Sequence, residues 1–175
     1  MIRGPVIRLL TDRQGAAVIE LALIAPILAM LVIGVTDISI AYGHRLELEQ
    51  AVQRSMERVM QTTGVDTVEN TIKNEAVCQY NGRDGNGNCK TDRITSADVT
   101  VNYRLECLSG ATVASTQQTA SATTFDTYTC SAGQRESRYI SATAVDTYVP
   151  MFNLHFGTGP DGVYNLTATA GVRVQ

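Results

Sequence analysis

The strongest constraint on this 175-residue chain is an apolar run close to its N-terminus. Glu20 is the only ionisable residue between Ala16 and Val35. Because a helix rises about 1.5 Å per residue, a run of this length covers the roughly 30 Å hydrocarbon core of a bilayer. We therefore expect residues 16–41 to form a transmembrane helix with membrane lipid around it.

The segment before the run predicts the orientation of this helix. Residues 1–15 carry three arginines and one acid, and a basic flank stays in the cytoplasm under the positive-inside rule. The chain after Ala41 would then be exported. Removal as an ordinary signal peptide is the competing interpretation, but the run is long, contains Glu20 and Pro26, and precedes no clear small-x-small cleavage site.

The helix is expected to kink at Pro26 and to continue beyond the membrane. Proline has no backbone N–H, so it removes the hydrogen bond to the carbonyl of Ala22, a loss that membrane helices tolerate. Over residues 42–63 apolar residues recur every three or four positions, which indicates one buried face, and Thr62 to Gly64 is a natural stop. The residues of that face are Leu48, Val52, Met56 and Val59.

The remaining residues, 64–175, are expected to form one exported α+β domain. A short amphipathic helix is predicted within residues 66–78, with Val68, Ile72 and Val77 facing inward. Three later stretches alternate apolar and polar residues, which predicts an antiparallel sheet of three or four strands. Such a sheet would bury one face against the long helix and leave the other to solvent or a partner. The stretches are 97–107, 138–152 and 164–174.

Four cysteines, Cys78, Cys89, Cys107 and Cys130, follow the apolar run. An even number in a small exported domain favours two disulfides over four free thiols, and their spacing fits no zinc site. Adjacent pairing, Cys78 with Cys89 and Cys107 with Cys130, is preferred among three connectivities, each bond contributing roughly 3 kcal/mol. The Ser-, Thr- and Gln-rich loop between the second pair has little to bury and is expected to be mobile.

Neither a metal site nor a catalytic site is predicted. The series Asp84, Asn86, Asn88 begins like a calcium-binding loop, but Cys89 occupies the glycine position and Thr95 the position of the bidentate glutamate. A glycine-rich turn explains this stretch better.

The histidines and the charge composition likewise give no functional signal. His44 and His155 belong to no motif with a nucleophile or a metal ligand, so no cofactor is expected. A net charge of −3 with 18% charged residues leaves no basic patch, so nucleic acid is not expected as a partner.

The stretch from Gly15 to Leu21, GAAVIEL, places a glycine five positions before a glutamate at the start of the apolar run. It resembles the processing site of type IV prepilins. The longer region to Ala51 resembles TadE-like proteins, the pseudopilins of the tight-adherence (Flp) pilus system, although Leu21 stands where that family usually has Phe or Tyr. The matching residues are Gly15, Glu20, Ala22, Pro26, Gly34, Asp37, Ala41, Tyr42, Leu46, Leu48 and Ala51.

The resemblance implies a pseudopilin or minor pilin with a pilin-like fold, which is not an enzyme but a substrate. A prepilin peptidase would cut between Gly15 and Ala16. The implied partners are this peptidase, other pilin and pseudopilin subunits, and the assembly platform in the membrane. The implied location is the bacterial inner membrane, with the C-terminal domain in the periplasm, or the pilus itself.

Glu20 fits this interpretation chemically. A carboxylate inside a bilayer costs about 2.5 to 3.5 kcal/mol on insertion scales, so a nearby cation would matter. Cleavage would create an ammonium on Ala16, one helical turn away, and the family analogy pairs Glu20 with the amine of a neighbouring subunit during assembly. Alternatively, Glu20 reaches the cytoplasmic headgroups by itself.

Two other functions remain open at this stage. The chain could be an uncleaved single-pass anchor whose periplasmic β-rich domain binds a ligand, an envelope component or a surface. An exported hydrolase is the third hypothesis, and no sequence motif supports it.

Overall fold

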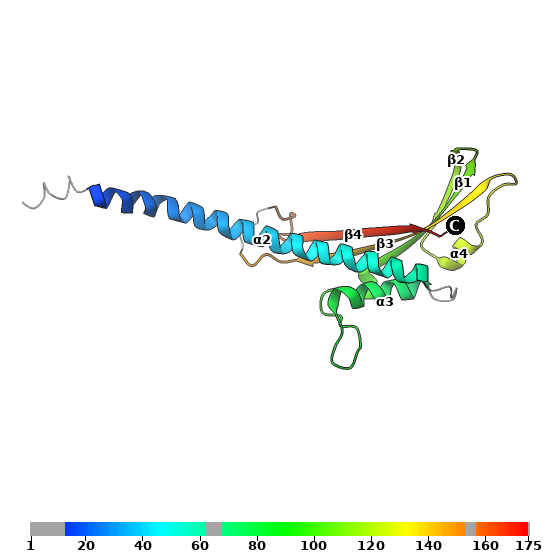
Figure 1. Cartoon of the computed structure of the whole chain (residues 1–175), viewed down its shortest axis with the longest axis horizontal. Helices are drawn as coiled ribbons and strands as arrows, with labels where there is room; N and C mark the ends of the chain where they lie inside the picture. Colours follow the sequence, from blue (N-terminus) through cyan, green and yellow to red (C-terminus); the bar gives the residue numbers. More distant parts are fainter. Residues whose placement is uncertain (1–12, 62–67, 153–156, 175) are drawn as a thin grey trace, which may run out of the picture.

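The computed structural model describes residues 13–61, 68–152 and 157–174 (Figure 1). Most of the expected leader, 1–15, lies outside these residues, as do Thr62 to Gly64 and His155. The fold is α+β: one long apolar helix is followed by a small four-stranded antiparallel sheet, which confirms the predicted fold class. The elements are α2 (Arg13–Gln61), α3 (Val68–Asn81), η2 (Ser96–Asp98), β1 (Val99–Ser109), β2 (Thr112–Thr119), α4 (Ala122–Asp126), β3 (Arg135–Tyr148) and β4 (Tyr164–Arg173).

The long helix α2 has two parts with different surroundings (Figure 1). Its N-terminal part extends away from the rest of the chain, and its C-terminal part lies on the sheet. Pro26 is inside this one helix, and the kink expected there stays a prediction. The predicted inward face is confirmed for Leu48, Val52 and Met56, which are almost completely buried. The structure does not describe the side chain of Val59, so its inward position stays a prediction.

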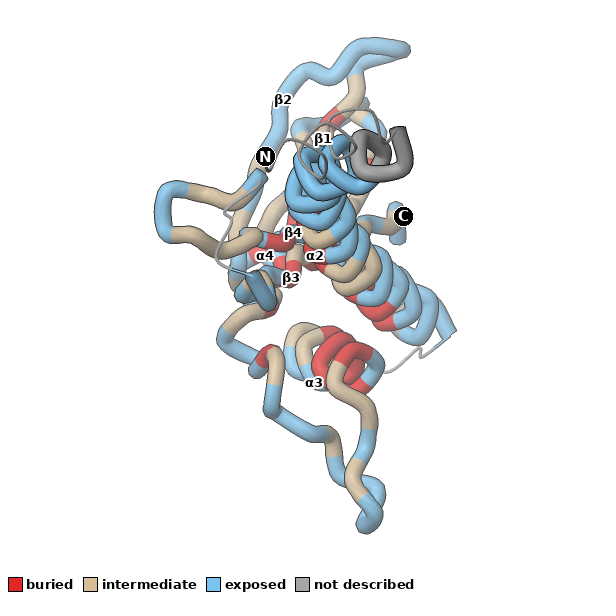
Figure 2. The backbone as a smooth tube through the Cα atoms, turned by 90° about the vertical axis from the view of Figure 1, so that its left-hand side faces the viewer, coloured by how far each residue is buried: buried red, intermediate tan, exposed pale blue. Residues whose placement is uncertain are grey.

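The sheet has the strand order β2-β1-β3-β4, and its inner face packs on helices α2 and α3. Helix α2 contacts β3 and β4, whereas α3 contacts mainly β1. Alternation of side chains along each strand places Leu105, Ala142, Ala144 and Ala168 in the core and polar residues on the open face. Seen along α2, the buried residues gather where the helices meet the sheet (Figure 2).

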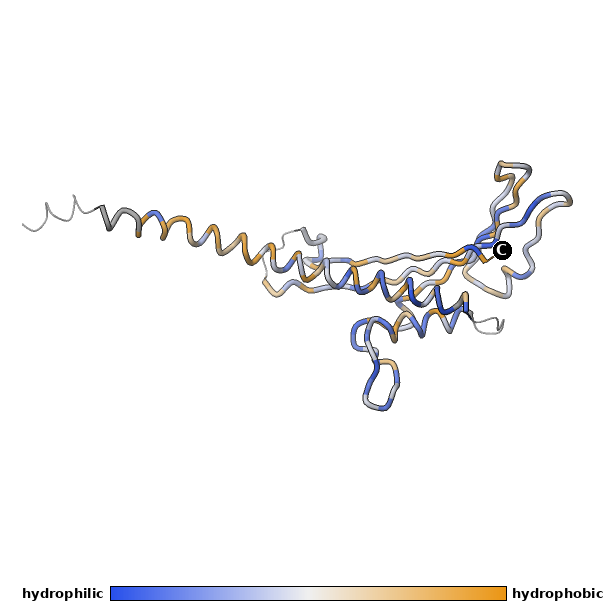
Figure 3. The backbone as a smooth tube through the Cα atoms, viewed as in Figure 1, coloured by the Kyte–Doolittle hydropathy of each residue, from blue (hydrophilic) through white to orange (hydrophobic). Residues whose placement is uncertain are grey.

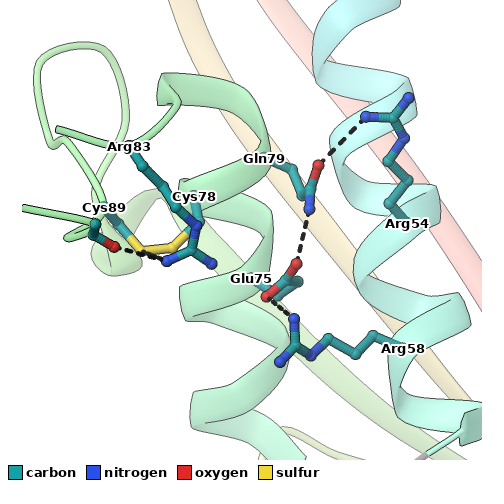
Figure 4. A network of polar contacts seen from close by, with 8 residues as sticks. Arg54, Arg58, Glu75, Cys78, Gln79, Arg83 and Cys89 are labelled. Atoms are coloured by element: carbon teal, nitrogen blue, oxygen red, sulfur yellow. Dashed lines mark hydrogen bonds and ion pairs between the residues drawn. A yellow bond between two sulfur atoms is a disulfide. The ribbon is translucent and has the colours of Figure 1, made fainter. Parts of the chain in front are cut away.

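Helix α3 packs on α2 through apolar contacts and through a network of hydrogen bonds and one ion pair. Ile72 and Val77 are buried as predicted; the side chain of Val68 is not among those described. Beside this apolar surface, α2 and α3 exchange hydrogen bonds and an ion pair (Figure 4). Arg58 Nη1 lies 3.0 Å from Glu75 Oε2, Gln79 Nε2 donates to Glu75 Oε1 at 2.8 Å, and Arg54 Nη1 donates to Gln79 Oε1 at 3.3 Å.

The cysteines pair as adjacent partners, Cys78 with Cys89 and Cys107 with Cys130. The first bond closes a tight turn in which Asp84 Oδ1 accepts the backbone N–H groups of Asn86 at 2.9 Å and Asn88 at 2.8 Å. These hydrogen bonds, that from Asn88 first, lower the pKa of the Asp84 carboxyl. The series Asp84, Asn86, Asn88 therefore forms a turn, as the sequence predicted.

The segment between Cys107 and Cys130, which was expected to be a loop with little to bury, has regular secondary structure. It contains strand β2, which pairs with β1 across a turn at Gly110 (φ 64°), and the short helix α4. Phe125 of α4 is 5% exposed and packs on Tyr103 with ring centroids 5.3 Å apart. Most of its side chains are exposed, as expected, but threonine pairs well in strands and one phenylalanine docks the short helix; the expected mobility stays a prediction.

Candidate functional site

The N-terminal part of α2 is an apolar surface with no cover from the rest of the chain. Its most apolar 18-residue window is only 6% buried, and the apolar colour follows the free part of the helix in Figure 3. A core helix of a water-soluble protein would be mostly covered, so this helix requires an apolar environment outside the described chain. It fits a single-pass membrane anchor. The large exposed side chains include Val18, Leu21, Ile24, Ile27, Leu31, Val35 and Ile38.

Polar side chains on this part of α2 are few, and two of them bond to their own helix. Thr36 Oγ1 donates to the carbonyl of Val32 at 2.8 Å, and Ser39 Oγ donates to that of Val35 at 2.7 Å. Bonding to the helix backbone satisfies both hydroxyls without water, which suits a low-dielectric surrounding.

Glu20 is exposed on the free part of α2 and has no hydrogen-bond or ion-pair partner within the described chain. The backbone at Gly15 and Ala16 is also helical, so Ala16 lies one turn before Glu20. The side chains of residues 13–17 are not described, and the roles predicted for Gly15, Ala16 and Glu20 stay predictions.

Asp37 connects α2 to the segment that follows β3. It is 4% exposed, and its two carboxylate oxygens accept the backbone N–H groups of Met151 at 3.0 Å and Phe152 at 3.2 Å. Hydrogen bonds to a charged group contribute about 1.5–3 kcal/mol each, so this contact makes a buried acid tolerable. Sequence reasoning named Asp37 as a matching acid and missed its partners, because they are backbone groups far along the chain.

Aromatic rings pack beside this contact. His44 is half-buried and meets Tyr148 edge-on at 5.0 Å between ring centroids, and Tyr164 lies 6.0 Å from Tyr148. The Tyr148 hydroxyl is buried and faces the Asp37 carboxylate, although the geometry falls short of a regular hydrogen bond. Burial, followed by the negative charge of Asp37, raises the pKa of Tyr148, so this phenol stays neutral.

The open face of the sheet carries a shallow hollow of about 560 Å³. One row of residues crosses all four strands beside it: Arg104 pairs with Gln118 on one side and with Tyr139 on the other, and Tyr139 pairs with Arg173. The Arg104 guanidinium lies 4.7 Å from the Tyr139 ring centroid. Within the described residues, no group of three His, Cys, Asp or Glu could hold a metal ion.

The comparisons with known proteins give one match. The family model for TadE-like protein matches residues 15–56. The searches of curated proteins and of solved structures find no match for this chain. The match confirms the TadE-like resemblance over this range, which ends within α2 and leaves the sheet outside.

Proposed function

We propose that this chain is a pseudopilin or minor pilin of a tight-adherence pilus, which acts by assembling with other pilin subunits. The observation that carries the proposal is the exposed apolar part of α2, continuous with the part that organises the sheet. Such a helix is suited to leave the bilayer and pack against helices of other subunits, because both surroundings are apolar.

The proposal divides the chain into four segments. Residues 1–15 are the cytoplasmic leader, 16–41 the transmembrane helix, 42–63 its periplasmic continuation, and 64–175 the exported domain with two disulfides. The arginines of the leader favour this orientation, and the disulfide bonds suit an oxidising compartment. The prepilin peptidase and the assembly platform are the partners proposed in the membrane.

Processing would remove residues 1–15 and place a new ammonium on Ala16. Glu20 is exposed one turn further along α2, so its carboxylate is free to meet the amine of a neighbouring subunit. The pairing offsets the cost of a carboxylate in the bilayer, which is about 2.5 to 3.5 kcal/mol on insertion scales. Assembly is then favoured in one register, with each Glu20 opposite an amine.

The test is the Glu20→Gln substitution in the native host. We expect normal membrane insertion and loss of pili, because glutamine keeps the shape of the side chain but carries no charge to pair. Thr36→Ala is the matched control on the same helix, since among the described residues its hydroxyl bonds to its own helix. Unchanged piliation in the Glu20→Gln strain would contradict the assembly role.

The alternative function is an uncleaved anchor whose β-rich domain binds a ligand or surface. The hollow beside Arg104 and Tyr139 on the open sheet face favours it. In that case substitution of Tyr139, with Glu20 intact, would abolish this binding while leaving membrane insertion and piliation unchanged.

A further inference from the structure

A second apolar surface lies on the segment that follows β3. Val149, Met151 and Phe152 are 69%, 71% and 42% exposed, and Pro150 lies between them. No residue of this short run is ionisable. Consecutive exposed apolar residues are unusual on a water-soluble surface and indicate a contact with something apolar.

The run is fixed to α2 at one level of the helix. Asp37 holds the N–H groups of Met151 and Phe152, so these residues cannot move along α2 without breaking both hydrogen bonds. From Val18 to Asp37 the helix rises about 28 Å, close to the roughly 30 Å thickness of the hydrocarbon core. In Figure 1 the segment after β3 lies at the end of the domain nearest the free part of α2.

The residues around this level suit a membrane–water boundary. Tyr42, one turn or so beyond Asp37, is 59% exposed, and tyrosine is enriched at the headgroup level of bilayers. Arg45 and Glu49 form an exposed ion pair at 3.1 Å one to two turns further on. The sequence of surfaces along α2 therefore changes from apolar to aromatic to charged.

We propose that residues 149–152 insert into the outer interfacial region of the same bilayer that α2 spans, making the exported domain a two-point membrane anchor. The inference rests on the proposed function, because it requires α2 to be membrane-spanning. The occupant is lipid because the exposed run adjoins the apolar part of the helix at the depth where that part ends. Asp37 is the positioning residue of this anchor, since it holds the run against the helix.

This second anchor would restrict how the domain moves before assembly. A single helix lets the domain rotate and tilt freely, whereas a contact at Met151 and Phe152 fixes one side of the domain toward the membrane. The open face of the sheet would then have a defined orientation relative to the bilayer. Withdrawal from the membrane into a pilus would require this contact to break.

The chain contains no tryptophan, so single substitutions provide a unique fluorescent reporter. Phe152→Trp and Met151→Trp report on the proposed anchor, and Leu28→Trp reports on the membrane part of α2. Val113→Trp reports on the start of β2. Each full-length variant is reconstituted at a low protein-to-lipid ratio in phosphatidylethanolamine–phosphatidylglycerol vesicles. Lipids brominated at shallow or deep positions quench tryptophan according to its depth, and near-UV circular dichroism checks folding.

The proposal predicts that shallow bromines quench Phe152→Trp and Met151→Trp most strongly, deep bromines quench Leu28→Trp, and neither quenches Val113→Trp. Adding Asp37→Ala to Phe152→Trp should reduce the shallow quenching and shift the emission to longer wavelength. Adding Thr36→Ala should change neither, because within the described part of the chain the Thr36 hydroxyl bonds to α2 itself.

Other outcomes separate the possible errors. If Leu28→Trp is quenched but both reporters at 151 and 152 are not, the second anchor is refuted while the membrane helix stands. If Leu28→Trp is not quenched either, the membrane anchoring in the proposed function fails as well. A third outcome is that Phe152→Trp emits at short wavelength but is not quenched by brominated lipid, and that this blue shift disappears on dilution into excess lipid. A second copy of this chain would then cover the run, and the proposal would be overturned.

Discussion

Substitutions at two leucines of α2 distinguish the packing of this helix within the chain from its contacts with other molecules. Leu48 is 0% exposed in the core beneath the sheet, whereas Leu46, two residues earlier, is 41% exposed. Leu48→Ala removes apolar volume from the buried core cluster, which also contains Val52 and Val101. Buried leucine-to-alanine substitutions cost about 2–5 kcal/mol in the free energy of unfolding.

The expected shift in thermal stability follows from this range. A loss of about 3 kcal/mol lowers the unfolding midpoint by roughly 6–12 °C in a chain of this size, at about 2–4 °C per kcal/mol. Leu46→Ala should lower the midpoint far less, because exposed positions usually change stability by within about 0.5 kcal/mol. Leu46 lies instead on the exposed surface of α2, so under the proposed function its substitution should affect assembly.

The assay is thermal unfolding of the full chain in detergent, followed by near-UV circular dichroism of the tyrosines. This signal reports on the folded domain and not on the detergent-covered part of α2. A midpoint lowered in Leu48→Ala and nearly unchanged in Leu46→Ala supports the packing described above. Equal shifts in both variants would mean that α2 does not present this face to the sheet.

Further predictions concern the domain. Tyr103 has a buried hydroxyl without a partner among the described residues, so Tyr103→Phe should raise the unfolding free energy by about 1 kcal/mol in urea titrations. Burial, followed by the charges of Glu69 and Asp126, raises the pKa of Tyr103 from 10 to about 12. The unfolded chain therefore loses this proton first; stability present below pH 10 falls as pH rises toward 12, and Tyr103→Phe should make that fall shallower. Phe125→Ala should cost about 3–5 kcal/mol and abolish the contact of α4 with β1, measurable as faster amide exchange in 122–126; unchanged exchange would contradict the docking of this helix. Cys107→Ala with Cys130→Ala should cost about 3 kcal/mol in the same titrations, whereas an unchanged midpoint would show that the bond contributes no constraint.

The parts of the fold that sequence could predict are those in which a local pattern decides the structure. The apolar run and the spacing of Leu48, Val52 and Met56 predict α2, and strict alternation predicts β1, β3 and β4. Strand β2 was missed because its residues are polar on both faces and its pairing depends on β1. Because β2 buries no apolar face, its sequence lacks the alternation of apolar and polar residues that identifies a strand.

The Asp37 contact was beyond sequence reasoning for a different reason. Its partners are main-chain N–H groups, which every residue except proline possesses, so nothing in the identities of Met151 and Phe152 indicates the bond. The apolar run at 149–152 suggests a second membrane anchor only because the contact with Asp37 places it beside the apolar part of α2. The spacing of Gly15 and Glu20, by contrast, is a local pattern, so sequence alone predicts their roles, which stay predictions.

The most direct test of the proposed function is the intact mass and N-terminal sequence of the protein from its native membrane, with and without the prepilin peptidase. We predict a mature chain that begins at Ala16 when the peptidase is present and at Met1 when it is deleted. A chain that still begins at Met1 beside a fully processed major pilin would contradict the proposal and move the function to the exported sheet.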